Sequence, residues 1–472
     1  MPRLITMKFG GTSVGSPEAI RLAAEAVAAT FNPAQTRVVV VVSAMSGVTD
    51  LLQEGILRAT DGAPRHAQIA SELRSRHSET ACALITNKDE RAEAHSKIAA
   101  LVDDFARFCD SVQVIGEATP RARDYVMSLG ERMSVQLIAA AFRANGLPAV
   151  AVESSDLIVT DERFQDAAPD LERTRARTRE VVLPLLEAGR VPVITGFIGA
   201  TPGGLITTLG RGGSDYSASL IGACLDSDEV WIWTDVDGVM STDPRVVPDA
   251  RSIERLTYRE VGELAYFGAK VLHPKTLRPL GETATPLWVK NTFNPTHPGT
   301  LILPEQPTNG GPVKAVTAIR AVSMISVEGK GMLGVPGIAA RTFGAVAATG
   351  TSVLLISQAS SEQSICFVVP QNSAPGVVRA LEAEFARELD RHDIERIDLE
   401  DDITIVTVVG ARMRHIPGIA ARIFGATGAA GINVIAIAQG SSECSVSIVV
   451  SEEDGDAAVR AIHALALSWP EG

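Results

Sequence analysis

The sequence has few cysteines, few aromatic residues and no long apolar run. Its five cysteines are scattered, odd in number and never spaced as CxxC, which argues against a disulfide framework or a zinc site and fits a reducing cytosol. Aromatic residues make up only 4% of the chain, too few for a surface on which single-stranded nucleic acid stacks. The apolar run Val38 to Val42 is too short to span a bilayer and is typical of a buried strand in a parallel sheet. The first residues show no secretory signal pattern, so we expect a cytoplasmic protein.

Acidic residues outnumber basic ones. The chain of 472 residues carries 56 Asp and Glu against 43 Lys and Arg, a formal net charge of −13. Such a surface repels a phosphodiester backbone and anionic lipid, so we expect no nucleic acid and no membrane among the partners. Any anionic substrate must therefore meet locally concentrated Lys and Arg side chains. The length corresponds to about three domains at roughly 150 residues each.

The C-terminal third contains an internal duplication. When Pro336 is aligned with Pro417, 34 positions follow without a gap and 20 of them are identical. Each copy has an alternating strand, a Pro-Gly loop, a helix, two strands around Ser-Ser-Glu and a second helix. This β-α-β-β-α order predicts two ferredoxin-like modules, which we place at residues 321–395 and 402–472. Such a repeat either stabilises or dimerises the chain, or acts as a paired small-molecule sensor.

A segment rich in proline, glycine, threonine and asparagine separates the repeats from residues 1–303. Within this front part, strand patterns alternate with helical patterns, which predicts an α/β sandwich around a mostly parallel sheet. Residues 304–320 are predicted to be a linker, in which Lys314–Arg320 is a candidate strand that completes the second module rather than the first. The stretch from 53 to 128 is expected to be helical and polar, with no assigned chemistry. The other predicted helices are Pro17–Ala29, Glu131–Ala144, Ser214–Cys224 and Tyr258–Lys270.

A first glycine loop follows the apolar residues Leu4–Met7 and precedes a helical pattern. It contains Lys8 and the adjacent glycines Gly10 and Gly11. Adjacent glycines let backbone N–H groups approach a phosphate closely, a helix N-terminus favours an anion, and lysine adds a compact positive charge. A tight strand-to-helix turn without a ligand has the same sequence appearance, and the chain has no GxxxxGK[ST] loop.

A second glycine loop, LGRGGSD, begins at Leu209 and runs into a helical pattern. It does not match GxGxxG, which argues against a dinucleotide-binding fold. Arg211 within it is suited to binding a carboxylate or phosphate through its planar guanidinium group. Asp215 has two interpretations, as a helix cap or as a functional carboxylate.

Two further segments carry turn formers or charge beside predicted elements. Residues 234–245 follow a strand and form either a surface loop or a nucleotide clamp that ends at Arg245. Residues 267–274 end a predicted helix, where Lys270 either complements the helix dipole or binds a ligand. His273 precedes a proline and is interpreted as a packing residue.

In this order, the segments KFGGTS, VVSAMSGVTD, GE at a helix, LGRGGSD, TDVDG…DPR and FGAKVLHP resemble the aspartokinase family. The resemblance covers essentially the whole chain, because aspartokinases end in two tandem ACT modules of the ferredoxin-like type. It implies the amino-acid-kinase fold, an αβα sandwich, for the front part. It also implies an enzyme that phosphorylates the side-chain carboxylate of L-aspartate with ATP and Mg²⁺, the entry step to lysine, threonine and methionine synthesis. Because the chain stops about twenty residues after the second copy, we expect a monofunctional enzyme.

The same resemblance implies roles for individual residues. Lys8 bridges the transferring phosphoryl group and Asp215 orients Lys8, so these are the implied catalytic residues. Arg211 binds the α-carboxylate of aspartate, and Glu131 binds its α-amino group. The remaining implied contacts to aspartate are Ser43, Thr49 and Ser214. The implied nucleotide contacts are Lys8, Gly10, Gly11, Thr234, Asp235, Met240, Arg245 and Lys270.

Two details qualify these implied contacts. Met240 stands where some family members carry a tyrosine beside the adenine, and the polarizable sulfur of methionine also packs against a purine. No metal ligand is assigned to the chain, because the ATP phosphates are expected to hold most of the Mg²⁺ coordination.

The modules resemble those of threonine-sensitive aspartokinases, including the kinase halves of aspartokinase–homoserine dehydrogenases, in the segments ISQASSE and IAQGSSE. Gln358 and Gln439 are the implied effector residues, since an amide both donates to and accepts from a hydroxyl-bearing amino acid. Glu362 or Glu443 facing an ammonium group leaves lysine as the alternative effector. ACT modules of this family usually pair across subunits, which implies a homodimer or tetramer.

Two other functions remain open on the sequence alone. One is a different amino-acid kinase, acting on glutamate or carbamate, against which Arg211, Glu131 and the paired modules argue. The other is a non-catalytic amino-acid sensor with a decayed kinase half, against which the intact Lys8, Asp215 and Lys270 argue.

Overall fold

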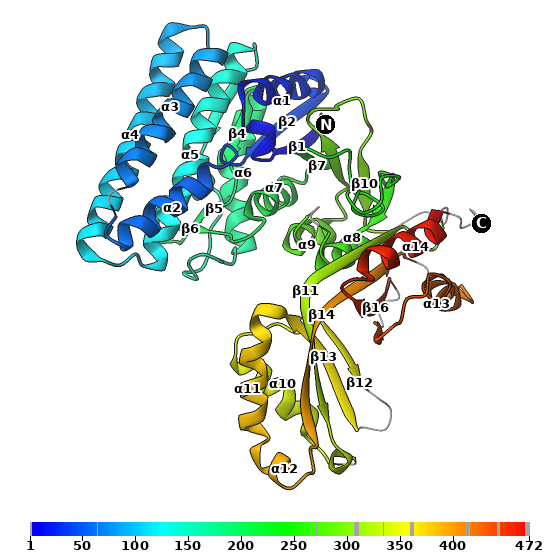
Figure 1. Ribbon diagram of the computed structural model, residues 1–472. Coiled ribbons are helices and arrows are strands. Elements are labelled where there is room, and N and C mark those ends of the chain that lie inside the picture. The colour runs from blue at the N-terminus through cyan, green and yellow to red at the C-terminus, as the bar shows by residue number, and fades with distance from the viewer. Residues whose placement is uncertain are drawn as a thin grey trace. The chain divides into compact units, whose positions relative to one another are not determined.

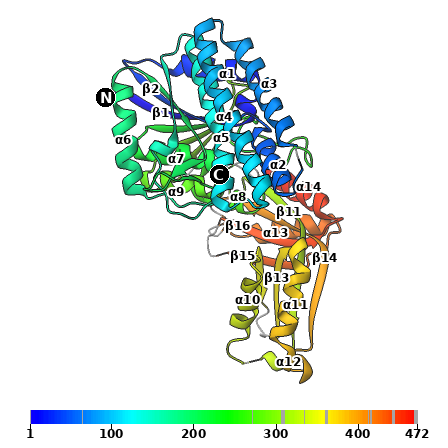
Figure 2. The same cartoon turned by 90° about the vertical axis from the view of Figure 1, so that its left-hand side faces the viewer.

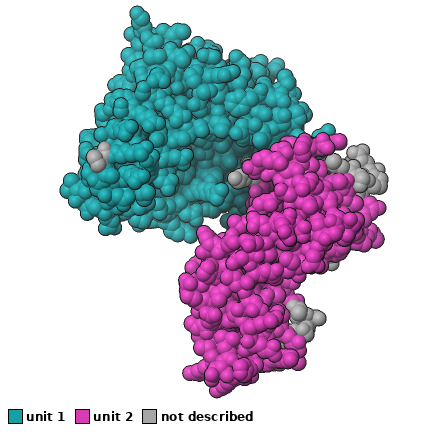
Figure 3. Space-filling view, viewed as in Figure 1, with its two compact units in different colours: residues 1–239, 252–261, 271–306 teal, residues 240–251, 262–270, 307–472 magenta. Residues whose placement is uncertain are grey.

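The computed structural model describes residues 2–63, 65–269, 272–305, 311–333, 335–358, 363–411, 413, 416–440 and 444–467. The chain divides into two compact units, drawn in different colours in Figure 3. The first comprises residues 1–239, 252–261 and 271–306. The second comprises residues 240–251, 262–270 and 307–472.

The described residues of the first unit form an eight-stranded sheet that is mostly parallel. Its strands, in spatial order, are β3 (Ala149–Val152), β4 (Val191–Thr195), β2 (Thr36–Val42), β1 (Arg3–Phe9), β7 (Glu229–Thr234), β9 (Leu287–Asn291), β10 (Thr300–Leu303) and β8 (Arg255–Thr257). Only the β9–β10 pairing is antiparallel. A short antiparallel hairpin stands apart, formed by β5 (Ile198–Ala200) and β6 (Ile206–Thr208).

Helices cover this sheet and extend beyond it. They are α1 (Pro17–Thr30), α2 (Val48–Thr60), α3 (His66–Leu84), α4 (Lys88–Ile115), α5 (Pro120–Ala144), α6 (Leu171–Glu187), α7 (Gly213–Cys224), α8 (Tyr258–Tyr266) and α9 (Pro274–Thr283). Helices α2, α3, α4 and α5 lie side by side, so the polar stretch that the sequence left without chemistry forms a helical bundle (Figures 1 and 2). Helix α5 begins well before the predicted Glu131, because Thr119 caps it by accepting from the Ala122 N–H and Pro120 occupies its first turn.

Side chains along β1 point alternately to the two faces of the sheet, one covered by α1 and α5 and the other by α7. Ile5, Met7 and Phe9 are buried in the apolar core that contains residues of α1 and α5. Thr6 lies on the opposite face, where its hydroxyl is hydrogen-bonded to Ser227 and it lies close to Gly222 of α7. Side chains two positions apart on a strand share a face, so Lys8 lies on the α7 side of the sheet.

The second unit contains both repeats. Its six-stranded antiparallel sheet has the spatial order β12 (Leu355–Gln358), β13 (Ser364–Pro370), β11 (Ala315–Glu328), β14 (Arg396–Val409), β16 (Ser445–Ser451) and β15 (Ala436–Gln439). The helices of the unit are α10 (Ile338–Ala348), α11 (Ala374–Glu384), α12 (Ala386–Asp390), α13 (Ile419–Ala429) and α14 (Gly455–Leu467). Two apolar clusters, one around Phe367 and Phe385 and one around Ile423 and Ile448, form separate cores for the two modules.

Two long strands serve both modules at once (Figure 1). The first half of β11, Ala315–Ile319, pairs with β14 only, whereas Val322–Glu328 also pairs with β13 of the first module. In the same way, β14 pairs with β16 of the second module only from Ile403 onward. Most of the segment 314–320 belongs to β11, which pairs there with β14 and continues into the part that also pairs with β13 of the first module.

Two segments of the front part cluster with the second unit. Residues 240–251 and 262–270 fall inside the range 1–303 that the sequence assigns to a catalytic domain. Helix α8 contributes its first turn to the first unit and its remainder to the second. This helix ends at Tyr266, before the predicted end at Lys270, and Lys270 lies outside the described residues.

Candidate active site

The carboxyl ends of the central parallel strands meet at one edge of the sheet, where ligands of open α/β sheets bind. A cavity of about 300 Å³ opens there in the first unit. Seven of the residues implied by the sequence line it, namely Lys8, Ser43, Thr49, Glu131, Arg211, Ser214 and Asp215. The structure thus brings together every catalytic and aspartate-binding residue that the sequence analysis named.

An ion pair stands at the centre of this cavity. Lys8 Nζ, at the end of β1, lies 2.6 Å from Asp215 Oδ1, in the first turn of α7. Both side chains are largely buried, with exposed fractions of 10% and 18%. Low exposure reduces solvent screening, so each charge holds the other in place more firmly than at a surface.

The glycine loops bring backbone close to these charges. Gly210 and Gly212 both adopt a left-handed backbone conformation, with φ of 74°, which favours glycine. Gly10 has room for no bulky side chain, since a Cβ atom there would lie 3.2 Å from Lys8 Nζ. A Cβ atom on Gly196, at the end of β4, would lie 2.7 Å from the Ser214 Cβ atom. Of the glycines that line the cavity, Gly213 is equally confined, since a Cβ atom there would lie 2.6 Å from the Phe197 ring.

Glu131 on α5 is a buried acid beside this ion pair. Its exposed fraction is 4%, and burial raises its pKa to about 8, although backbone N–H groups and Lys8 act in the opposite direction. Its Oε2 atom has no hydrogen-bond partner among the described residues. A carboxyl group held in this way is ready to pair with a cation that enters the cavity.

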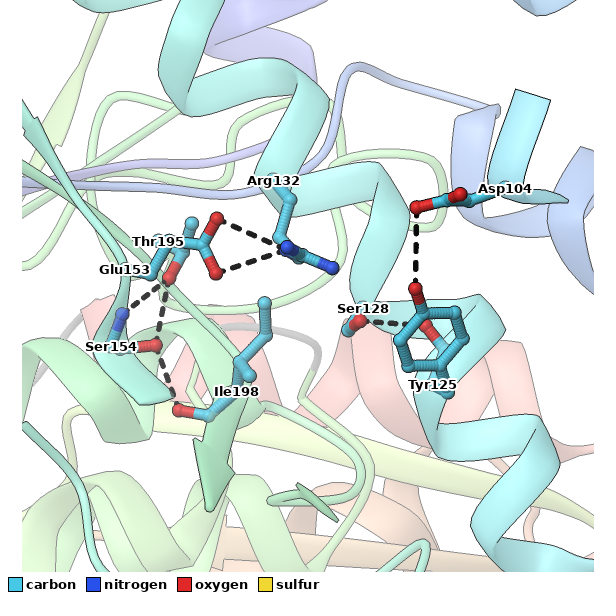
Figure 4. A network of polar contacts seen from close by, with 8 residues as sticks. All are labelled: Asp104, Tyr125, Ser128, Arg132, Glu153, Ser154, Thr195 and Ile198. Carbon is cyan, nitrogen blue, oxygen red and sulfur yellow. Dashed lines mark hydrogen bonds and ion pairs between the residues drawn. The ribbon is translucent and has the colours of Figure 1, made fainter. Parts of the chain in front are cut away.

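A polar network flanks Glu131 and fixes α5 against the sheet (Figure 4). Arg132 Nε donates to both oxygens of Glu153, at 3.1 and 3.0 Å, just beyond the end of β3. The Ser154 hydroxyl lies 2.8 Å from the Thr195 hydroxyl, at the end of β4, and donates to the Ile198 carbonyl. The helix that carries Glu131 is therefore tied to the segment after β3, which is tied in turn to the end of β4.

Asp124, two turns before Glu131 on α5, holds the approach to the second glycine loop. It is 1% exposed and accepts from the backbone N–H groups of Gln165 and Thr208 and from the Thr208 hydroxyl. Burial raises its pKa, and the hydrogen bonds oppose that shift. Thr208 ends β6 directly before Leu209 and Gly210, so Asp124 fixes where the loop that carries Arg211 begins.

Sequence reasoning missed Asp124 and one residue of the cavity wall, Phe197. Phe197 lies between β4 and β5 with a φ of 66°, and its N–H donates to the Ser217 hydroxyl. Its place directly after a buried parallel strand was the signal that would have identified it. No sequence pattern marks Asp124, because its partners are backbone groups from distant segments.

The predicted nucleotide residues are divided between the units. Gly10 and Thr234 stand at adjacent strand ends, since the Gly10 N–H donates to the Trp233 carbonyl at 3.2 Å. The Thr234 hydroxyl donates to Asp235 at 3.1 Å. Gly11 begins the turn after Gly10. Met240 and Arg245 belong to the second unit, where the exposed Arg245 is paired with Asp243 at 2.6 Å, and Lys270 lies outside the described residues.

A separate cavity of about 300 Å³ lies in the first module. It is lined by Gln358, at the end of β12, and by the Pro-Gly loop and first residues of α10. Gln439 occupies the equivalent end of β15, since Gln358 pairs with Ile365 and Gln439 with Val446 at matching positions of the repeat. Both amides are exposed. Glu362 and Glu443 lie outside the described residues.

Two features are absent from the described part of the chain. No group of three or more His, Cys, Asp or Glu side chains is placed to hold a metal ion. No helix in the same part combines the length and the apolar character needed to cross a bilayer.

Comparison with family models matches this architecture. The model of the amino acid kinase family matches residues 3–291, which is more than half of the chain. The ACT domain model matches twice, at residues 325–385 and 406–465.

Curated relatives and solved structures agree with the family models. Bifunctional aspartokinase/homoserine dehydrogenase 1 of Arabidopsis thaliana is 37% identical over 97% of this chain, which spans about half (50%) of that longer protein. Aspartokinase 2 of the same plant is 33% identical, over 97% of this chain and 83% of that protein.

The fold agrees with E. coli aspartokinase III, which is 28% identical and was solved with aspartate and ADP and with lysine and aspartate. The TM-scores are 0.79 and 0.78, with 98% of this chain covered in both cases and 99% and 100% of the other chain. On these matches, together with the shared motifs, the chain belongs to the amino acid kinase family and, within it, to the aspartokinases.

Proposed function

We propose that this protein transfers the γ-phosphoryl group of ATP to the side-chain carboxylate of L-aspartate and forms 4-phospho-L-aspartate. The observation that carries the proposal is the cavity in which Lys8 and Asp215 face Arg211 and Glu131. E. coli aspartokinase III, which has the same fold, was solved with aspartate and ADP bound.

The chemistry needs charge neutralisation rather than a general base. The side-chain carboxylate of aspartate has an ordinary pKa of about 3.9 and is already ionised at neutral pH. Its obstacle is the approach of one anion to the polyanionic triphosphate, which positioned cations and hydrogen-bond donors overcome. The wall of the cavity supplies Lys8, Arg211 and the backbone of a glycine loop for that purpose.

Aspartate is recognised at both ends of its amino acid backbone. Arg211 binds the α-carboxylate through two parallel N–H groups, the geometry that guanidinium shares with carboxylate. Glu131, buried and with one unpartnered oxygen, pairs with the α-ammonium group. Ser43, Thr49 and Ser214 line the remaining wall as hydroxyl donors to the carboxylates.

Lys8 neutralises charge on the transferring phosphoryl group, and Asp215 keeps the Lys8 ammonium group pointing into the cavity. Gly10 and Gly11 line the phosphates, and Gly11 presents its backbone N–H group to them, because the Gly10 N–H donates to the Trp233 carbonyl. Thr234, Asp235, Met240, Arg245 and Lys270 contact the rest of the nucleotide.

We propose that the ATP phosphates and water hold most of the Mg²⁺ coordination. A bound Mg²⁺ ion supplies neutralisation of the phosphate charge. Lys8 and the glycine N–H groups act on the same charge from the protein side.

The paired modules bind an amino-acid effector, for which threonine is our first proposal and lysine the alternative. Gln358 lines a cavity beside the first turn of α10, where an amide meets a hydroxyl-bearing ligand. E. coli aspartokinase III was solved with lysine, which keeps the alternative in view. We further propose a homodimer or tetramer formed through the modules, and a cytoplasmic enzyme at the entry to lysine, threonine and methionine synthesis.

A direct assay tests the activity. The protein is incubated with ATP, Mg²⁺ and L-aspartate, the acyl phosphate is trapped with hydroxylamine, and ADP is measured in parallel. We expect trapped product only with aspartate, and inhibition by threonine. ADP release with glutamate or carbamate but not with aspartate would assign a different kinase, and the absence of turnover with all three would leave an amino-acid sensor.

A further inference from the structure

The segment 240–251 leaves the first unit and returns to it. It starts after Val239 and ends before Ser252, both in the first unit, and the Ile253 N–H donates to the Val239 carbonyl at 2.8 Å to close its base. The body of the segment packs within the second unit. This is also the segment that carries Met240 and Arg245, two of the proposed nucleotide contacts.

A buried polar contact holds this segment to the C-terminal helix. The Ser241 hydroxyl lies 2.9 Å from His463 Nε2 on α14, and it accepts from the Arg251 N–H at 2.9 Å. His463 is 2% exposed and Ser241 is 6% exposed. The Ser241 carbonyl also accepts from the Val316 N–H of β11 at 2.8 Å. Ser241, the residue next to Met240, is thus fixed inside the second unit by two contacts of its hydroxyl and one of its carbonyl.

An apolar contact fixes the other end of the segment. Val247 is buried in the core of the second module, in the same cluster as Ile419 and Ile423 of α13 and Ile462 of α14. His463 follows Ile462 in the sequence. The polar contact with Ser241 and the apolar cluster around Val247 therefore use neighbouring residues of α14. Burial and the charge of Arg251 lower the pKa of His463, and Asp249 acts in the opposite direction. Because the net shift is downward, the imidazole is mostly neutral at neutral pH.

The first module has no histidine at the position that corresponds to His463. At the repeat offset, His463 corresponds to Glu382 on α11, which is exposed. The two modules are otherwise built on the same pattern. A buried histidine at one position and an exposed glutamate at the other indicate that the contact with Ser241 belongs to the second module alone.

We propose that His463 is a positioning residue for the nucleotide segment 240–251, acting through Ser241. This inference rests on the proposed function, because it concerns ATP affinity. When the contact is lost, Met240 and Arg245 are no longer held in one arrangement, and nucleotide binding must order them. The aspartate pocket lies wholly in the first unit, so aspartate affinity is unaffected.

The test uses the full chain and its variants. For His463→Ala and Ser241→Ala we expect the KM for ATP, and the Kd for ADP measured by calorimetry without aspartate, to rise about three- to tenfold. The KM for aspartate and kcat are expected to stay within about twofold. His463→Gln places an amide nitrogen near the position of Nε2 and is expected to restore most of the affinity. Because the two residues act through one contact, the double variant should be no weaker than either single variant.

Glu382→Ala serves as the matched control, and we expect wild-type constants for it. Unchanged ADP affinity in folded His463→Ala and Ser241→Ala variants would overturn the inference, as would equal rises in the KM values for ATP and aspartate. If His463→Ala does not fold, an unchanged ADP affinity in the milder Ser241→Ala variant overturns it alone. Failure of the wild-type protein to bind ADP would instead contradict the proposed function.

Discussion

Lys8 Nζ and Asp215 Oδ1 lie 2.6 Å apart, although Lys8 lies near the end of β1 and Asp215 lies in the first turn of α7. The alternation of β1 directs Lys8 toward α7, where Asp215 holds its ammonium group. The lysine that we propose meets the phosphoryl group is therefore held in one place, and little reorganisation is expected during the reaction.

Loss of this ion pair should reduce kcat far more than it reduces substrate binding. For Lys8→Ala we expect a loss of about 10³-fold, and for Asp215→Asn a loss of about 10²-fold, as when a preorganised donor is removed from a reacting centre. Steady-state kinetics with ATP and aspartate measures both. Lys8→Ala should keep its effector affinity in calorimetry, and a variant that lost effector binding together with turnover would be misfolded rather than informative.

Arg211 should determine affinity for aspartate without affecting ATP. Arg211→Lys keeps the charge but loses the planar pair of N–H groups, so the KM for aspartate is expected to rise about tenfold or more while the KM for ATP stays within about twofold. Arg211→Ala should raise the KM for aspartate further. Equal effects on both substrates would mean that the guanidinium group binds phosphate instead.

Glu131 should make aspartate binding depend on pH. Its pKa is raised to about 8 by burial, so the carboxyl group is mostly neutral at pH 6 and becomes able to pair with an ammonium group as the pH rises. We expect the KM for aspartate to fall steadily between pH 6 and pH 8. Glu131→Gln should show a high KM that does not change across this range, and a parallel pH profile in the two proteins would contradict the assignment.

The same group should affect stability in a defined direction. Its folded-state pKa lies above the ordinary value of 4.5, so between about pH 4.5 and pH 8 the folded protein holds a proton that the unfolded chain has released. The contribution of Glu131 is therefore complete below about pH 4.5 and is lost as the pH rises through about 8. In thermal unfolding without ligands, the Tm of the wild type should fall relative to that of Glu131→Gln over this window.

The two edge-strand amides should control inhibition and leave turnover intact. Gln358→Ala and Gln439→Ala remove a group that both donates and accepts at the effector, and we expect the threonine concentration for half-inhibition to rise about tenfold in at least one of them, with kcat within about twofold. Inhibition assays with threonine and lysine run side by side check this. If both variants retain wild-type inhibition by threonine, the effector lies elsewhere.

The residues that line the cavity were easier to predict from the sequence than the residues that hold them in place. Lys8, Arg211 and Asp215 stand in glycine loops at strand ends, and the carboxyl-edge rule brings such loops together in a parallel sheet. Glu131 came from family resemblance alone, because a glutamate inside a helix gives no local signal. The backbone partners of Asp124 become visible only when the chain is folded, since they are amide N–H groups, which every residue except proline possesses.

Segment ends and domain limits were harder to predict for a related reason. The front part was expected to be continuous to residue 303, yet 240–251 and 262–270 pack with the repeats. The signal for the first of these, a serine that contacts His463 more than two hundred positions later, has no counterpart in local periodicity. Long-range contacts of single side chains decide such boundaries.

Strands β11 and β14 each pair with a strand of their own module and with each other, so they join the two modules in one sheet. A gene truncated between the two copies would therefore leave the long strand of the surviving copy without its partner strand from the other copy, and would expose a row of unbonded amides. We therefore expect both copies to be retained or lost together, and any transfer of the pair to another protein would have to include the segments 240–251 and 262–270 that pack with it.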